Sequence, residues 1–248
     1  NYLIHFVNPD GSIRYRGPEI PQYARMLTSI SRYAEYSGDL GVLSEHRAKI
    51  EAIVEILMDR LRAGRARPAD ETAHGLVRGR QEADINFLAT SLAYEDYEQP
   101  YWNNSAETWR GFHELARGWA AESERIGDST LATRATELRA HADRLRADFD
   151  RAVAASVLTD RGEPYLPPIA GSTKYHIDSG YRSGPESFDD NRVWAEMMGS
   201  GLLRRDTIQV IADYIGGHWG STMGIVSNRV QIVVFQAHGQ AFGFIQND

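Results

Sequence analysis

Residues 20–57, "IPQYARMLTSISRYAEYSGDLGVLSEHRAKIEAIVEIL", carry the clearest structural signal in this chain. Apolar residues recur in the first half at spacings of three and four, which is the period of one face of an α-helix. The dipeptide Gly38-Asp39 interrupts the pattern, and a second helical pattern follows it. Glycine can end a helix in the left-handed conformation, and aspartate can cap the next helix. The segment therefore predicts two antiparallel helices joined by a short turn.

The same plan returns in residues 106–149, where two helical patterns flank Gly127-Asp128. Two similar hairpins favour a helical repeat architecture. Further helices are predicted over residues 189–203 and 205–215. In residues 228–245, "NRVQIVVFQAHGQAFGFI", the β-branched run favours a strand and the surroundings favour a helix, and we interpret the segment as a helix. Residues 1–18 predict an extended segment with a turn at Asn8–Gly11.

The composition narrows the class of protein. The chain has 248 residues and a net charge of −7, so no basic field attracts nucleic acid or an anionic membrane surface. No apolar run approaches the roughly 20 residues that cross a bilayer. Cysteine is absent, and we find no histidine pair at metal-ligand spacing and no nucleotide-binding motif, so we expect no metal and no cofactor. The compartment stays open, with a secreted or periplasmic location compatible with the sequence.

Two long connections, residues 65–102 and 160–188, are rich in aromatic and ionisable side chains, which is typical of ordered, functional loops. In residues 73–87 of the earlier connection, the charged side chains could form surface ion pairs or a ligand site, and the two interpretations are equally good. Further along it, aromatic side chains without helical period stand beside asparagines, a combination that suits a sugar. From this connection and the start of the first helix we take these candidates: Arg16, Glu19, His74, a carboxylate at Glu82 or Asp84, Trp102 and Asn103. For Glu19, favourable electrostatics at the helix N-terminus is an equally good interpretation.

The later connection ends in "YHIDSGYRSGPESFDDNRVWAE", residues 175–196. A helix cap explains one of its carboxylates, Asp189 or Asp190, but not the rest of the cluster. Hydrolysis of a glycosidic bond needs two carboxylates, one as acid and one to activate water or attack carbon. The cluster therefore suggests glycosidase chemistry, with these candidates: Tyr181, Arg182, Glu186, Asp190 and Trp194.

Three segments, "YRGPEIPQYARMLTSISRYAEYSGDLGVLSEHRAKIEAIVEIL", "YWNNSAETWRGFHELARGWA" and "GPESFDDNRVWAE", resemble the six-hairpin (α/α)6-toroid glycosidases. The resemblance implies an all-α, toroid-like array of helical hairpins in which residues 1–248 form a single catalytic domain. A complete toroid has six hairpins, so we expect this chain to be part of a longer polypeptide. By position, Glu186 would be the acid and Asp84 the base, and the other candidates would line the site.

These observations together predict an inverting glycoside hydrolase that acts on an oligo- or polysaccharide without a metal. The arginines in the candidate loops favour an acidic sugar. One alternative is a polysaccharide lyase on the same scaffold, in which Tyr181 or His176 would remove a proton next to a uronate carboxylate. The other alternative is a non-catalytic helical module that binds glycans or proteins.

Overall fold

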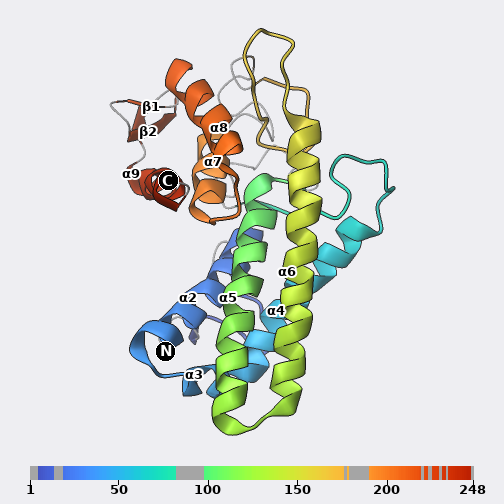
Figure 1. The fold of residues 1–248 in the computed structure, drawn as a ribbon, viewed down its shortest axis with the longest axis vertical. Helices are drawn as coiled ribbons and strands as arrows, with labels where there is room; N and C mark the ends of the chain where they lie inside the picture. The colour runs from blue at the N-terminus through green and yellow to red at the C-terminus, as the bar shows by residue number, and fades with distance from the viewer. Residues whose placement is uncertain are drawn as a thin grey trace.

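The computed structural model describes residues 5–13, 19–81, 98–175, 178, 190–218, 221–222, 225–228, 231–232 and 234–246. These residues are mostly helical, which confirms the predicted all-α class (Figure 1). The helices are α2 (Ile20–Ser37), α3 (Gly41–Glu45), α4 (Arg47–Arg65), α5 (Trp102–Ile126), α6 (Ser129–Ser156), α7 (Asp190–Gly199), α8 (Arg205–Gly217) and α9 (Val234–Gln246). A small antiparallel sheet contains β1 (Ser221–Thr222), β2 (Ile225–Asn228) and β3 (Gln231–Ile232) in that order.

Both Gly-Asp dipeptides form the predicted turns. Gly38 ends α2 with φ 73° and Gly127 ends α5 with φ 70°, both in the left-handed region. Asp128 then caps α6, because its Oδ1 accepts the backbone N–H groups of Thr130 and Leu131 at 2.9 and 3.1 Å. The expected cap at Asp39 is wrong, since α3 begins after Leu40 without a side-chain cap.

Two predicted helices are divided in the structure. The second helix of the first hairpin consists of α3 and α4, which His46 separates. Residues 228–245 were interpreted as one helix, but strands occupy their first part and α9 begins at Val234. The strand preference of β-branched residues thus governs only the beginning of that segment. The turn at Asn8 is confirmed, with the Gly11 N–H donating to the Asn8 carbonyl at 3.0 Å.

The second hairpin lies beside the first as a parallel copy. Three ion pairs join α2 to α5, namely Arg25–Glu107, Arg32–Glu114 and Glu35–Arg117, and each joins residues 82 positions apart. A constant offset means that the two helices run in the same direction. They approach closely, because a Cβ atom on Gly111 would lie 2.7 Å from the Ala24 carbonyl oxygen. The second helices of the hairpins follow suit, with Arg47 of α4 paired with Asp128 at 2.9 Å and Arg134 of α6 paired with Glu51 at 3.0 Å.

The series of neighbouring helices continues beyond α5. Asn103 and Arg110 of α5 contact Glu196 and Gly199 of α7, so α7 also follows the direction of α5. Helix α9 packs on α7 through Gly239 and Gly243, and a Cβ on Gly243 would lie 2.9 Å from the Met198 Cβ. We call α2, α5, α7 and α9 the helix row. Helix α4 packs against α2 and α6 against α5 (Figure 1).

The apolar core fills the space between these helices and the segment from Tyr165 to Ala170. Trp102, Trp119 and Trp194 are its largest fully buried side chains. Within the part of the chain that the structure describes, none of the helices combines the length and apolar character needed to cross a bilayer.

Candidate functional site

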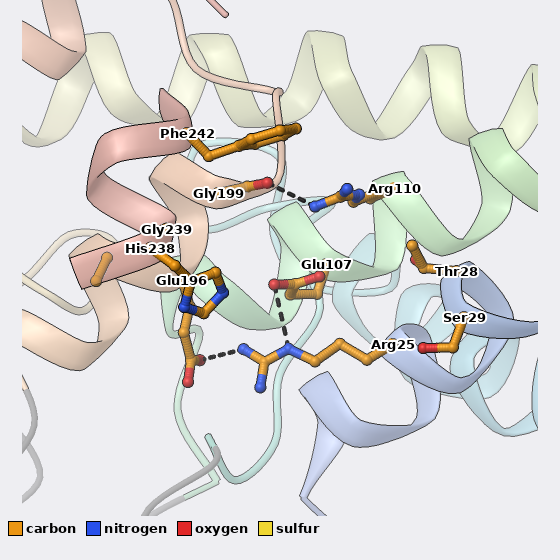
Figure 2. Close-up of a pocket in the computed structure, with 11 residues that line it drawn as sticks. Arg25, Thr28, Ser29, Glu107, Arg110, Glu196, Gly199, His238, Gly239 and Phe242 are labelled. Atoms are coloured by element: carbon orange, nitrogen blue, oxygen red, sulfur yellow. Dashed lines mark hydrogen bonds and ion pairs between the residues drawn. The ribbon is translucent and has the colours of Figure 1, made fainter. Parts of the chain in front are cut away.

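A cavity of about 500 Å³ opens between the four helices of the row (Figure 2). Each helix contributes side chains to its wall, and the chemically active ones are Arg25, Glu107, Arg110, Glu196 and His238, with Phe242 as the aromatic wall. Arg25, Glu107, Glu196 and His238 all lie within the first two turns of their helices. The cavity therefore extends from the second turn of these helices to the third, where α7 ends at Gly199.

Two glutamates from different helices share one arginine at this cavity. Arg25 Nε lies 3.3 Å from Glu107 Oε1, and Arg25 Nη2 lies 2.9 Å from Glu196 Oε2 (Figure 2). The glutamate side chains are only 7% and 11% exposed. Asn103 also donates its amide N–H to Glu196 Oε2 at 2.6 Å. Charge-assisted hydrogen bonds of this kind hold both carboxylates in defined orientations at the cavity wall.

Helical spacing explains why α5 contributes several of these groups. Asn103, Glu107 and Arg110 stand at positions i, i+4 and i+7, which share one face of a helix. This polar stripe runs along a helix whose first turns are almost entirely buried. Because buried polar groups need partners, the stripe faces α2 and α7, which supply Arg25 and Glu196.

Arg110 occupies the opposite end of the cavity from Arg25 (Figure 2). Its Nη1 donates to the Gly199 carbonyl at 2.6 Å, and its guanidinium carbon lies 5.6 Å from the centre of the Phe242 ring. None of the carboxylates in the described residues forms an ion pair with it. His238 comes from α9 and adds an imidazole to the cavity wall beside Glu196 (Figure 2).

Several predicted site residues lie outside the residues that the structure describes. They are the proposed acid Glu186, the proposed base Asp84, and Arg16, Tyr181 and Arg182. The backbone of Asp190 begins α7, but its side chain is likewise not described. These assignments stay predictions.

Asn103 is the one described candidate that belongs to the cavity region, through its bond to Glu196. Trp102 and Trp194 do not line the cavity. Both are fully buried, and their indole N–H groups donate to the Pro167 and Leu166 carbonyls. Their faces pack in the core, so neither ring can stack on a ligand as the structure stands, and the expectation that they line the site is wrong.

Glu19 and His74 also lie away from the cavity wall. Glu19 is buried at the start of α2, where its carboxylate accepts from the Gln22 amide. His74 donates from Nδ1 to the Arg67 carbonyl at 2.9 Å. Next to it, Glu71 pairs with Arg67 at 2.7 Å and with Arg78 at 3.3 Å. The described part of residues 73–87 thus contributes Arg78 to an ion pair with Glu71; residues 82–87 lie outside the described residues, and the choice between ion pairs and a ligand site stays a prediction.

Sequence reasoning missed Arg25, Glu107, Arg110, Glu196 and His238. The available signal was the polar stripe on α5, because Asn103, Glu107 and Arg110 share one face of that helix. Among the described residues, no group of three or more histidine, aspartate or glutamate side chains is placed to hold a metal ion.

Comparison of the chain with protein-family models, with curated proteins and with solved structures gave no match in any of the three. Chemically, the cavity offers carboxylate acceptors at one end, a guanidinium donor at the other, and an imidazole and an aromatic ring between the helices. Such a mixture of acceptors, donors and an aromatic face suits a polyhydroxylated ligand.

Proposed function

We propose that this chain belongs to a glycoside hydrolase and that the cavity between α2, α5, α7 and α9 binds the sugar. The observation that carries the proposal is the pair of buried carboxylates, Glu107 and Glu196, held by Arg25 at the cavity wall. A carboxylate has several lone pairs, so each can accept from sugar hydroxyls while it keeps its bond to arginine. Phe242 offers an apolar ring to the C–H face of a sugar.

The arrangement of helices supports a toroid-like architecture as part of this proposal. Helices α2, α5 and α7 run in the same direction, and a second helix packs beside α2 and beside α5. In an (α/α)6 toroid, such helices form the inner ring around a funnel. The cavity, with residues from all four members of the row, corresponds to part of that funnel.

We propose Glu186 as the general acid and Asp84 as the base that activates water, with inversion at the anomeric carbon. In the sequence, Asp84 belongs to the connection that leads into α5, and Glu186 to the one that leads into α7. These two helices carry Glu107 and Glu196 near their beginnings, beside the cavity. Glu107, Glu196 and Arg25 then bind the sugar, while the two connections supply the reacting groups.

Substitution Glu186→Gln tests the assignment of the acid. A general acid contributes about 10²- to 10⁴-fold to the rate, so we expect kcat to fall by that factor with little change in KM. Activity is first located on a panel of neutral and acidic polysaccharides by release of reducing ends, and the anomer formed first is read by NMR. Wild-type kcat in the variant would remove Glu186 from the mechanism. Binding without any product from the panel would favour a non-catalytic module.

A polysaccharide lyase is the second candidate, and His238 favours it. An imidazole that shares a cavity with Arg25 and Arg110 provides a base beside cations, which is what proton removal next to a uronate carboxylate requires. The product distinguishes the two reactions, because a lyase leaves an unsaturated uronate that absorbs ultraviolet light and a hydrolase does not.

A further inference from the structure

We infer that the ligand of this cavity is an acidic sugar and that Arg110 pairs with its carboxylate. The inference rests on the proposed function for the identity of the ligand as a sugar. The inference that the ligand carries a negative charge rests only on the groups that surround Arg110.

Arg110 differs from the other two arginines of α5 in its partners. Arg117 pairs with Glu114 at 3.2 Å and with Glu35 at 2.8 Å, and Arg125 pairs with Glu122 at 2.5 Å. In the described part of the chain, Arg110 has a carbonyl and an aromatic ring as partners but no carboxylate. It is also the only one of the three that lines the cavity.

The guanidinium group of Arg110 is held in place before any ligand arrives. One N–H bonds to the Gly199 carbonyl, and the Phe242 ring lies beside the charged group. A guanidinium carries five N–H donors, so donors remain for a bidentate contact with a carboxylate. Because the side chain is half-buried, such a pair is less screened by water than one on the open surface.

The distribution of groups along the cavity fits one uronic acid unit. The end at Arg25 presents the carboxylate oxygens of Glu107 and Glu196, which accept from hydroxyls and repel a second carboxylate. The other end presents Arg110, which attracts one (Figure 2). A uronate has hydroxyls around the ring and a single carboxylate, so it can satisfy both ends at once. A neutral sugar would leave Arg110 without a counter-charge.

The experiment compares trimers of glucuronate, galacturonate and mannuronate with their methyl esters, which keep the ring and remove the charge. Binding is measured by calorimetry for the wild type, Arg110→Met, Arg110→Lys and Arg139→Met. Arg139 is exposed on α6, so its substitution controls for net charge. We expect at least one acid to bind about tenfold or more tightly than its ester, since a charge-assisted pair is worth roughly that factor. Arg110→Met should abolish the difference and leave the ester affinity unchanged, Arg110→Lys should keep part of it, and Arg139→Met should keep all of it.

Equal affinity for acid and ester in the wild type would overturn the inference, as would an absence of binding. Equal weakening of both ligands by Arg110→Met would assign Arg110 to packing, and a thermal melt of the variant checks this. Other outcomes distinguish a failure of the proposed function from a failure of this inference. If acids bind through Arg110 but no glycan is cleaved, the hydrolase is excluded and the anion site stands. If a neutral glycan is cleaved by the wild type but the acids bind no more tightly than their methyl esters, the hydrolase stands and the anion site is excluded.

Discussion

Two ion-pair clusters join helices α2 and α5. Both contain an arginine of α2 paired with a glutamate of α5, but the groups around the two pairs differ. One is the Arg25 cluster, in which Arg25 contacts Glu107 and also Glu196 of α7. The other is the Arg32 cluster, in which Arg32, Glu35, Glu114 and Arg117 form a closed set of pairs. Both use residues 82 positions apart.

The difference lies in the third helix. Helices α2 and α5 alone supply the Arg32 cluster, and its two arginines balance its two glutamates. Burial alone would lower the pKa of Arg32, but the charge and hydrogen bond of Glu114 outweigh burial, so the pKa of Arg32 is raised. The Arg25 cluster puts one arginine between two glutamates at the wall of a cavity. An ion pair between packed helices is therefore first interpreted as a structural contact. A neighbouring cavity and an additional carboxylate are what identify the Arg25 cluster as a candidate binding site.

Among the changes that compare the two clusters, substitution Glu196→Gln tests the Arg25 cluster and should have the largest effect. The amide keeps the shape of the side chain but weakens its bonds to sugar hydroxyls, so we expect KM to rise about tenfold or more. We expect kcat to stay within a few-fold of the wild type, which is the reverse of the result for Glu186→Gln. Steady-state kinetics on the substrate found in the panel gives both constants. A collapse of kcat at constant KM would transfer the chemistry to Glu196.

The matched change in the Arg32 cluster is Glu114→Gln. Because the Glu114 side chain is 7% exposed and pairs with two arginines, we expect the free energy of unfolding to fall by about 1 kcal/mol. Hydrolysis should stay within twofold of the wild type. Urea unfolding measures the first quantity and the activity assay the second. A large loss of activity with unchanged stability would show that the two clusters are not different in kind.

The smallest expected effect concerns pH and His113, which neighbours Glu114 on α5. Burial, and then the charge of Arg139, lowers the pKa of His113, and its ring stacks on Trp109 at 5.2 Å between centroids. The unfolded chain therefore binds a proton more readily than the folded one. Stability is complete above the ordinary histidine pKa of about 6.5 and falls as the pH drops below it. Urea midpoints at pH 7 and pH 5 should differ less in His113→Gln than in the wild type, and an equal difference would rule out a contribution from His113.

The sequence predicted the hairpins well because their signals are local. Gly38 and Gly127 end helices whatever lies around them, and apolar spacing defines which face packs. The cavity has a weaker signal, since the polar stripe on α5 marks Glu107 but Glu196 resembles an ordinary solvent-facing glutamate of a helix. They become neighbours only because α5 and α7 lie side by side, which no short segment encodes.

Trp102 and Trp194 show the opposite error. Each stands at or near the beginning of a helix beside polar residues, which suggested a binding surface. The core there is completed by the extended segment around Tyr165, whose ring meets Trp194 at 6.0 Å between centroids, and by Phe149, whose ring meets Trp102 at 5.3 Å. A tryptophan can thus be central to the core without belonging to a periodic stripe, because non-helical chain covers it.

The contact between α7 and α9 has a consequence for the width of the cavity between the helices of the row. There Gly239 lies against the backbone of Ala195 and Gly199, and Gly243 lies against the backbone and Cβ of Met198. Alanine at position 243 would act as a wedge behind α9 and displace His238 and Phe242 relative to Glu196. One methyl group at position 243, outside the cavity lining, would then change the size of the ligand that the proposed site accepts.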